Sequence, residues 1–195
     1  EKNKVILLSK SGKVLWEYDV KGQIISEVFQ PDIYKNNKKQ YLFATEDKIF
    51  CLDRRGRMVK GFPIAINASK IQTFTLIDYD GSKKYRLLCS TNKNELRMYN
   101  MEGKNLKGWN PQKIQGKLIE PAKHIRVKGK DVILAIQENG KIHLWNRSGR
   151  ENSKFPIDVK TPLQGDIFIS KEKNIKNSTI TFLTQKGEIL KFNLK

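Results

Sequence analysis

Asp78 and Asp80 are the residues whose types and spacing come closest to a metal site. They stand in the stretch Asp-Tyr-Asp-Gly-Ser, and alternate carboxylates in a tight loop are how calcium loops gather hard oxygen ligands. A full loop takes a third oxygen ligand from the next positions, but Lys83 and Lys84 follow here, and their charges repel a dication. The favoured interpretation is an Asp-Gly turn with no metal or cofactor, and calcium is the alternative.

The two histidines, His124 and His143, offer little for catalysis. Each stands in a strand-like stretch, with no Cys, Asp or Glu beside it at the spacing of a ligand set. We therefore expect both to be residues of a strand face. The sequence also shows no Gly-rich phosphate loop, nucleophile elbow or paired acidic motif, so it identifies no catalytic residue.

The two cysteines, Cys51 and Cys89, lie inside apolar runs without a partner at metal-ligand spacing. Small thiols of this kind are among the most buried residues, and we expect both to be buried in the core. A disulfide between them would need adjacent strands in register. The spacing cannot establish that register, and the redox compartment stays open.

A glycine turn recurs along the chain and defines a repeat. Gly12, Gly56, Gly103 and Gly149 each lie between two strand-like runs, 44 to 47 residues apart. A period of about 40 to 50 residues is typical of four-stranded propeller blades. We predict one segment over 1–195, with repeats at approximately 1–22 (partial), 23–69, 70–118, 119–163 and 164–195 (partial).

The fourth repeat shows the expected blade most completely. Strands are predicted at 132–137 and 141–146, joined by the Asn-Gly turn at 139–140, in which a type I′ hairpin would place both residues at positive φ. The glycine turn at 147–149 then leads to a weaker fourth strand that closes at the Phe-Pro of 155–156. No segment has a sustained period of 3.6 residues, so essentially no helix is expected.

Aromatic residues recur near the third and fourth strands of the repeats. They are Trp16, Phe62, Trp109, Trp145 and Phe155, and the closing signatures read Gly-Phe-Pro at 61–63, Gly-Trp-Asn-Pro at 108–111 and Phe-Pro at 155–156. A packing role recurs in every unit, whereas a binding site need not. Packing between blades is therefore favoured over a platform for a ligand.

Two stretches resemble known propeller families. The sequence SGKVLWEYDV at 11–20 resembles the repeat of the PQQ-type (quinoprotein-like) β-propellers, and LIDYDGSKKYRLL at 76–88, with GFPI at 61–64, is similar to the FG-GAP/VCBS repeat. The resemblance implies a β-propeller and a periplasmic or cell-envelope location. Such propellers serve as dehydrogenases, assembly scaffolds and adhesion modules. The quinoprotein tryptophan is kept only at Trp16, which argues against a quinone cofactor.

The predicted fold is an all-β propeller of four-stranded antiparallel blades. The strands do not divide into whole blades, which favours about four blades in an open or partial ring. The chain begins at Glu1 without Met or a leader peptide, and we expect a piece of a larger propeller. Open blade edges would invite self-association with a second copy. No apolar run approaches the roughly 18 residues of a membrane span.

The net charge of +18, from 38 Lys and Arg against 20 Asp and Glu, is large enough to favour acidic partners through long-range attraction. The cations are scattered over nearly every turn, which favours a solvated lysine-rich surface. The predicted function is a non-catalytic interaction or binding platform, with protein as the first partner class, within a larger cell-envelope protein. The alternatives are a small-ligand or quinone-cofactor enzyme, and a binder of a polyanion (acidic polysaccharide or nucleic acid) through lysine-rich rim loops. Collection of the cations on one rim would favour a polyanion.

Overall fold

Five antiparallel β-sheets make up the computed structural model, which describes residues 3–66, 69–109 and 112–194. In chain order the sheets are β1–β2 (Asn3–Leu8, Val14–Val20), β3–β5 (Tyr41–Ala44, Lys48–Leu52, Ile64–Ala65), β6–β9 (Ile71–Ile77, Arg86–Thr91, Glu95–Tyr99, Gln112–Lys113), β10–β13 (Lys123–Val127, Lys130–Ile136, Lys141–Asn146, Ile157–Asp158) and β14–β16 (Leu163–Ser170, Thr179–Thr184, Ile189–Asn193). Among the described residues the only helix is a 3₁₀ turn, η1 (Ile175–Asn177), and no helix there is long and apolar enough to cross a membrane.

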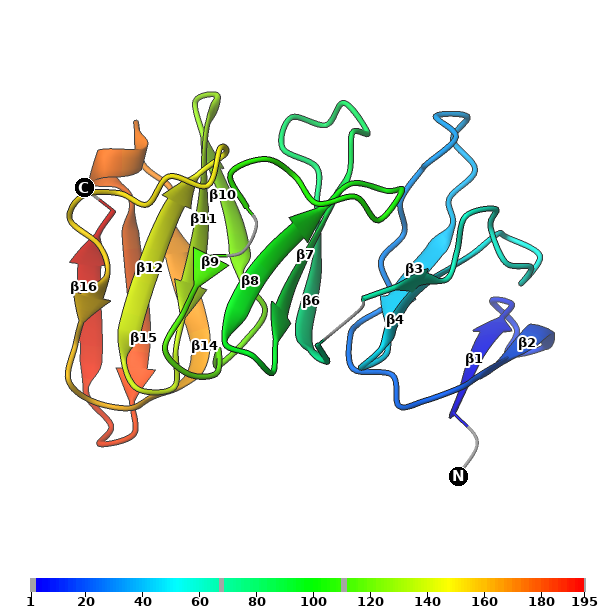
Figure 1. Ribbon diagram of the computed structural model, residues 1–195, viewed down its shortest axis with the longest axis horizontal. Helices are drawn as coiled ribbons and strands as arrows, with labels where there is room; N and C mark the ends of the chain where they lie inside the picture. Colours follow the sequence, from blue (N-terminus) through cyan, green and yellow to red (C-terminus); the bar gives the residue numbers. More distant parts are fainter. Residues whose placement is uncertain (1–2, 67–68, 110–111, 195) are drawn as a thin grey trace.

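The sheets follow one another in chain order along the long axis of the molecule (Figure 1). The N- and C-termini lie near opposite ends, and the first and last sheets do not meet. Consecutive sheets pack through four apolar clusters, one at each junction, because a single sheet cannot bury both of its faces. This arrangement is the predicted all-β series of blades in an open arc.

The first strand expected in the second repeat is not formed as a ladder. The chain makes only isolated bridges there, between Ile24 and Thr45 and between Phe29 and Leu42. The backbone N–H of Ala44 donates to the side-chain oxygen of Ser26 at 2.9 Å. A side-chain acceptor thus replaces a backbone one, and the regular ladder is interrupted.

The fourth strands lie further along the chain than predicted. After the glycine turns at Gly56, Gly103 and Gly149 a single bridge joins the third strand, as between Trp145 and Glu151, and the chain then turns away. The N–H of Phe155 donates to the carbonyl of Asn152 at 2.9 Å in this turn, and β13 forms only beyond it. The turn places Phe155 in the core, so the Phe-Pro precedes the fourth strand and does not close it. In the third repeat, Asn110 and Pro111 of the closing signature lie outside the described residues.

The turn at Asn139-Gly140 also differs from the prediction. Gly140 has a φ of 89°, but Asn139 is not in the positive-φ region. The N–H of Gln137 donates to the carbonyl of Lys141 at 2.8 Å, which closes a longer loop of the type I plus bulge kind. The side chain of Asn139 donates to the carbonyl of Gln115 at 2.9 Å, which holds the loop against the preceding connection.

The glycine turns share one hydrogen-bonded design. Each glycine has a φ of 77 to 79°, a region that residues with a Cβ rarely adopt. Three residues before it, a side-chain oxygen accepts the backbone N–H of the residue after the glycine, at 2.9 to 3.0 Å. These acceptors are Ser9, Asp53, Asn100 and Asn146. The pattern of a short polar residue, two residues and Gly is therefore the local cause of each reversal.

The repeated tryptophans pack between sheets, as predicted. The indole N–H of Trp16, in the first sheet, donates to the carbonyl of Arg54 in the glycine turn of the second, at 3.1 Å. Trp109, after the third sheet's turn, donates in the same way to the carbonyl of Arg147 in the fourth, at 3.0 Å. Each tryptophan thus ties one sheet to the glycine turn of the next.

The cysteines confirm the predicted core. Cys51 in β4 and Cys89 in β7 are fully buried and free, and both belong to the cluster between the second and third sheets. Burial raises the pKa of the Cys51 thiol to about 12, and it also raises the pKa of Cys89. Both thiols are therefore protonated and act as small apolar side chains.

Candidate functional site

Loops leave the sheets at two rims, because antiparallel strands alternate in direction. We call one the arginine rim; it holds the loop before β3, the β6–β7, β10–β11 and β14–β15 loops, and the glycine turns, along the upper side of Figure 1. The opposite rim holds the β3–β4, β7–β8, β11–β12 and β15–β16 hairpins and the connections between sheets. Any loop residue of the chain is assigned to a rim by this alternation.

Arginines are distributed unequally between the rims. Lysines occur on both, but seven of the eight arginines lie in or beside the loops of the arginine rim, and the eighth, Arg97, lies within β8. The seven are Arg54, Arg55, Arg57, Arg86, Arg126, Arg147 and Arg150. The expectation of evenly scattered cations therefore holds for lysine and fails for arginine.

The predicted metal residues lie in the β6–β7 loop of this rim. Asp80 Oδ2 accepts a hydrogen bond from Arg147 Nη2 at 3.0 Å, and Asp78 Oδ2 accepts the backbone N–H of Lys83 at 3.0 Å. A hydrogen bond from the Ser82 side chain and the bond from Arg147 hold the pKa of Asp80 well below its usual value. No group of three or more His, Cys, Asp and Glu in the described ranges could hold a metal ion. Calcium at these aspartates stays an untested alternative to the favoured Asp-Gly turn.

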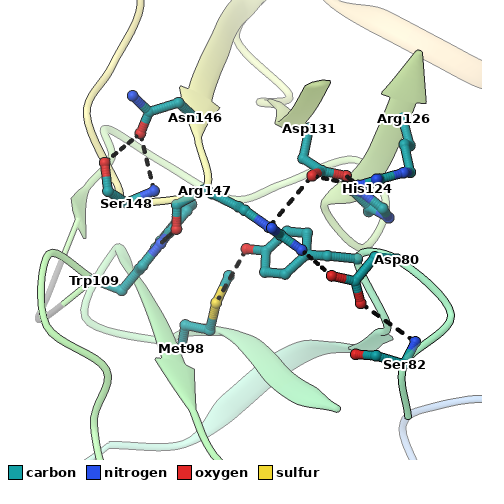
Figure 2. A network of polar contacts seen from close by, with 11 residues as sticks. Asp80, Ser82, Met98, Trp109, His124, Arg126, Asp131, Asn146, Arg147 and Ser148 are labelled. Atoms are coloured by element: carbon teal, nitrogen blue, oxygen red, sulfur yellow. Dashed lines mark hydrogen bonds and ion pairs between the residues drawn. The ribbon is translucent and has the colours of Figure 1, made fainter. Parts of the chain in front are cut away.

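Arg147 is the centre of a polar network that joins the third and fourth sheets (Figure 2). Its side chain leaves the glycine turn after β12 and reaches Asp80, while its Nε lies 3.3 Å from Asp131 Oδ2. The guanidinium also stands 4.5 Å from the ring centroid of Tyr79, which is a cation–π contact. Burial raises the pKa of Tyr79 to about 12, so this ring is neutral at ordinary pH. Two carboxylates and one ring thus hold the arginine in place.

Asp131 belongs to the same network and has a side chain that is 1% exposed. Its carboxylate lies 2.7 Å from Arg126 Nη1 and 2.7 Å from His124 Nε2. The β10–β11 register places Arg126 directly opposite Asp131, across the turn at Lys128-Gly129. Sequence analysis missed this cluster, although that two-residue turn was a signal from which the register could have been counted.

His143 is a strand-face residue, as expected. Its Nδ1 lies 2.6 Å from Glu151 Oε1, and its Nε2 lies 3.1 Å from Gln137 Oε1. The ring stacks on Trp145 at a centroid distance of 5.0 Å and is 6% exposed. Both ring nitrogens are therefore engaged inside the sheet, which assigns this histidine a structural role.

A cavity of about 450 Å³ opens beside Arg147 between the third and fourth sheets. Its polar lining comes from four cations, two serines and one carboxylate: Lys84, Arg86, Lys107, Arg147, Ser82, Ser148 and Asp80. Its apolar lining comes from Tyr79, Met98, Leu106 and Trp109. A second cavity, of about 680 Å³, lies between the fourth and fifth sheets and shares Arg147 and Ser148. The site therefore offers fixed positive charge above an apolar floor.

No protein-family model and no curated protein matches this chain, but its fold matches solved structures. BBS1N, crystallised in complex with ARL6DN, has a TM-score of 0.68 and 11% identity, and the match covers 99% of this chain and 59% of that chain. A protein of unknown function from Bacteroides caccae has a TM-score of 0.57 and 15% identity, with 98% and 69% covered.

The fission yeast SREBP-SCAP binding domains have a TM-score of 0.54 and 10% identity, with 96% of this chain and 54% of that chain covered. At such low identities the likeness shows the fold alone. Together with the series of antiparallel sheets, it defines a β-propeller-like fold. This chain spans 59% of the BBS1N chain that it matches.

Proposed function

We propose that this chain is a non-catalytic binding platform that presents its arginine rim to an acidic macromolecular partner. The observation that carries the proposal is the gathering of seven of eight arginines on one rim. Arginine binds carboxylates and phosphates through a rigid fork of donors, whereas lysine acts as a point charge. Binding to an acidic partner therefore explains arginines gathered on one side better than solubility alone does.

Three arginines of this rim are held in place by contacts within the chain. Arg57 is paired with Asp53 at 2.8 Å, Arg86 Nη1 donates to the carbonyl of Tyr85 at 2.9 Å, and Arg147 is fixed by two carboxylates. Groups already ordered lose less side-chain entropy on binding. Long-range attraction by the net charge of +18 would also speed encounter with an acidic surface.

A charge-reversal experiment tests the proposal. The variant Arg54→Glu/Arg55→Glu/Arg150→Glu changes three exposed cations of the arginine rim, and Lys93→Glu/Lys117→Glu/Lys186→Glu makes the same net change on the opposite rim. Titrated with poly-L-glutamate at low salt, the first variant should lose about tenfold in affinity and the second less than about threefold. Equal losses, or no saturable binding by the wild type, would overturn the proposal.

A protein is the favoured partner, and a nucleic acid or an acidic polysaccharide is the second candidate. BBS1N was crystallised with a protein partner, which supports the first choice only through a shared fold. The arginine-rich rim also favours the second. Parallel titrations with heparin and with a 20-nucleotide single strand separate the two classes.

We also propose that the chain is related to the PQQ-type and FG-GAP/VCBS propellers and lies in the cell envelope. This part of the proposal includes no quinone cofactor. A quinone enzyme would need a planar site lined by aromatic and cationic side chains, and the quinoprotein tryptophan is kept only at Trp16. Trp16 instead packs on the turn of the next sheet. We expect no saturable binding of pyrroloquinoline quinone in an equilibrium titration.

Self-association through the end sheets is a separate prediction. The first sheet exposes Ile6, Leu8, Val14 and Leu15 at 47 to 57%, and the last exposes Phe168 and Ile189 at 69 and 74%. A Cβ at Gly12 would meet no atom within 4 Å, whereas one at Gly56 would lie 2.7 Å from the Trp16 ring. The first sheet thus covers the glycine turn at Gly56, whereas no sheet in the described part of the chain covers the turn at Gly12. Analytical ultracentrifugation should show dimers at micromolar concentration, and a strict monomer would contradict this.

A further inference from the structure

We propose that the cavity between the third and fourth sheets at the arginine rim binds a short extended segment of a protein partner that pairs acidic side chains with an apolar one. The proposal rests on the proposed function, because it places that function's acidic partner at one defined site. The cavity, of about 450 Å³, lies within the usual size of roughly 300 to 1,000 Å³ for ligand pockets. It has room for a few side chains and none for a folded domain.

Positive charge in the cavity exceeds what its own carboxylate can balance. Asp80 is the one acidic residue in the lining, and it is already paired with Arg147 at 3.0 Å. Lys84, Arg86 and Lys107 make no ion pair within the described part of the chain. Three uncompensated cations around one opening are complementary to two or more carboxylates.

The cations are attached to a rigid frame. Arg147 is fixed by Asp80, by Asp131 and by the ring of Tyr79, and it forms the wall shared with the fourth sheet (Figure 2). Arg86 Nη1 donates to two backbone carbonyls of its own loop, at 2.9 and 3.3 Å. A ligand therefore meets two of the four cations already in place, which lowers the ordering cost of binding.

The floor of the cavity is apolar. Met98 and Trp109 are 0 and 1% exposed, and Leu106 packs on the same cluster with part of its surface open. An apolar side chain laid on Leu106 would remove additional apolar surface from water. This combination of cationic wall and apolar floor selects an acidic segment that also carries a Leu or Phe.

The aromatic residues of the site favour a peptide over a single-stranded nucleic acid. Nucleic acids bound in such grooves stack their bases on exposed aromatic faces. Here Tyr79 is 7% exposed and carries the Arg147 guanidinium on its face, while Trp109 is 1% exposed and packs against Trp145 at 6.0 Å. Neither ring offers a free face to a base.

The test uses defined probes and variants with matched charge. The first probe is an eight-residue peptide, Glu-Asp-Leu-Glu-Asp-Phe-Glu-Asp, and the second replaces its Leu and Phe with Gly. Lys84→Glu/Lys107→Glu reverses two exposed cations of the cavity, and Lys39→Glu/Lys154→Glu reverses two exposed cations elsewhere on the same rim. Circular dichroism checks that each variant is folded.

Isothermal titration should give at least a tenfold loss of affinity for Lys84→Glu/Lys107→Glu and less than a threefold loss for Lys39→Glu/Lys154→Glu. The glycine peptide should bind the wild type at least fivefold more weakly than the first peptide, and Leu106→Ala should narrow that gap. Equal losses for the two charge variants would overturn the proposal that the cavity is the binding site. The arginine rim would then remain as a diffuse binding face. Failure of the wild type to bind either peptide or poly-L-glutamate would overturn both proposals.

Two further outcomes would overturn the peptide as occupant. One is equal affinity for the two peptides, because the apolar floor would then make no contribution. The other is tighter binding of a 20-nucleotide thymidylate strand or of heparin, with the same dependence on Lys84 and Lys107. That result would assign the cavity to a polyanion.

Discussion

The two rims of the arc are built from similar turns but differ in how polar side chains connect them. On the arginine rim two carboxylates take cations from a neighbouring sheet: Asp80 pairs with Arg147, and Asp32 pairs with Lys83 at 2.5 Å. On the opposite rim, the ion pair that joins two sheets, Glu46 with Lys70, is exposed, while the buried carboxylate of Glu95 takes both of its cations, Arg97 and Lys113, from its own sheet. Among the described residues, polar contacts between sheets therefore occur on both rims, but the ion pair between sheets that includes a buried carboxylate, Asp32 with Lys83, lies on the arginine rim.

This difference shows that net charge alone describes the surface poorly. Lysines are spread over both rims, as a solvated surface requires, while arginines gather where loops of neighbouring sheets meet. Because a guanidinium can bind a carboxylate and stack on a ring at once, Arg147 can bridge Asp80, Asp131 and Tyr79. A lysine in its place could not make all three contacts.

Gly149→Ala should give the largest difference between the rims. A Cβ at this turn would lie 2.1 Å from the carbonyl oxygen of Gly108, and the φ of 79° adds strain. We expect a loss of about 3 kcal/mol in the free energy of unfolding. Gly187→Ala on the opposite rim, with a φ of 83° and no atom within 4 Å of the added Cβ, should cost about 1 kcal/mol. Urea unfolding measures both, and equal losses would show that the close approach of the Gly108 carbonyl oxygen does not add to the cost at Gly149.

Asp131→Ala should have the next largest effect. The change removes an almost fully buried carboxylate and leaves Arg126, His124 and Arg147 without this acceptor. Because those partners are partly exposed and can turn to water, we expect a loss of about 2 kcal/mol in the free energy of unfolding. Glu46→Ala on the opposite rim breaks only the exposed pair with Lys70 and should cost less than about 0.5 kcal/mol. A larger loss in the free energy of unfolding for Glu46→Ala than for Asp131→Ala would show that the opposite-rim ion pair contributes more to stability.

Acid should weaken the arginine rim, because two of its carboxyls have a lowered pKa in the folded state. The pKa of Asp32 is lowered by the hydrogen bond from Lys83, and that of Asp80 by the bonds from Ser82 and Arg147. A carboxyl whose pKa is lower in the folded state stabilises the fold above its unfolded pKa of about 3.9, and this contribution is lost as pH falls through the folded value. The Tm should therefore drop between pH 4 and pH 2.

The variant Asp32→Asn/Asp80→Asn isolates this contribution of the rim to acid stability. Its Tm should be lower than that of the wild type at pH 6, and the gap should narrow toward pH 2. Scanning calorimetry at several pH values gives the two curves. Curves that stay parallel over this range would show that these two carboxylates do not titrate with unfolding.

Calcium should have no measurable effect. Asp80 is paired with Arg147, and Asp78 is engaged by a backbone N–H, so the loop offers no ready set of ligands. One calcium site at a hundredfold excess over its dissociation constant would stabilise the fold by about 2.7 kcal/mol. Added calcium should therefore leave the Tm unchanged, with magnesium as the control. A rise in Tm with calcium but not with magnesium would indicate that Asp78 and Asp80 bind calcium.

The repeat could be predicted from sequence because each glycine turn has a local cause. A short polar residue three positions before the glycine caps the reversal, and the four turns gave the period and the blade. The fourth strands were placed wrongly, because burial of Phe62, Trp109 and Phe155 is decided by packing on neighbouring sheets. Local pattern alone carries no information on that packing.

The candidate site was predictable only in part. The pair of Arg126 and Asp131 follows from the register of one hairpin, and the side of the molecule on which each arginine lies follows from strand alternation. The contact of Arg147 with Asp80 joins residues 67 positions apart, on different sheets. It depends on how the third and fourth sheets pack, and no local spacing could have shown it.

Hydrogen exchange in the presence of saturating poly-L-glutamate reports on both rims in one measurement. We expect slower exchange in the arginine-rim segments 53–60, 78–86 and 146–152, and no change in the opposite-rim hairpins at 92–95, 137–141 and 185–188. Protection that is equal on the two rims, or confined to the opposite one, would contradict the claim that the arginine rim is the binding face.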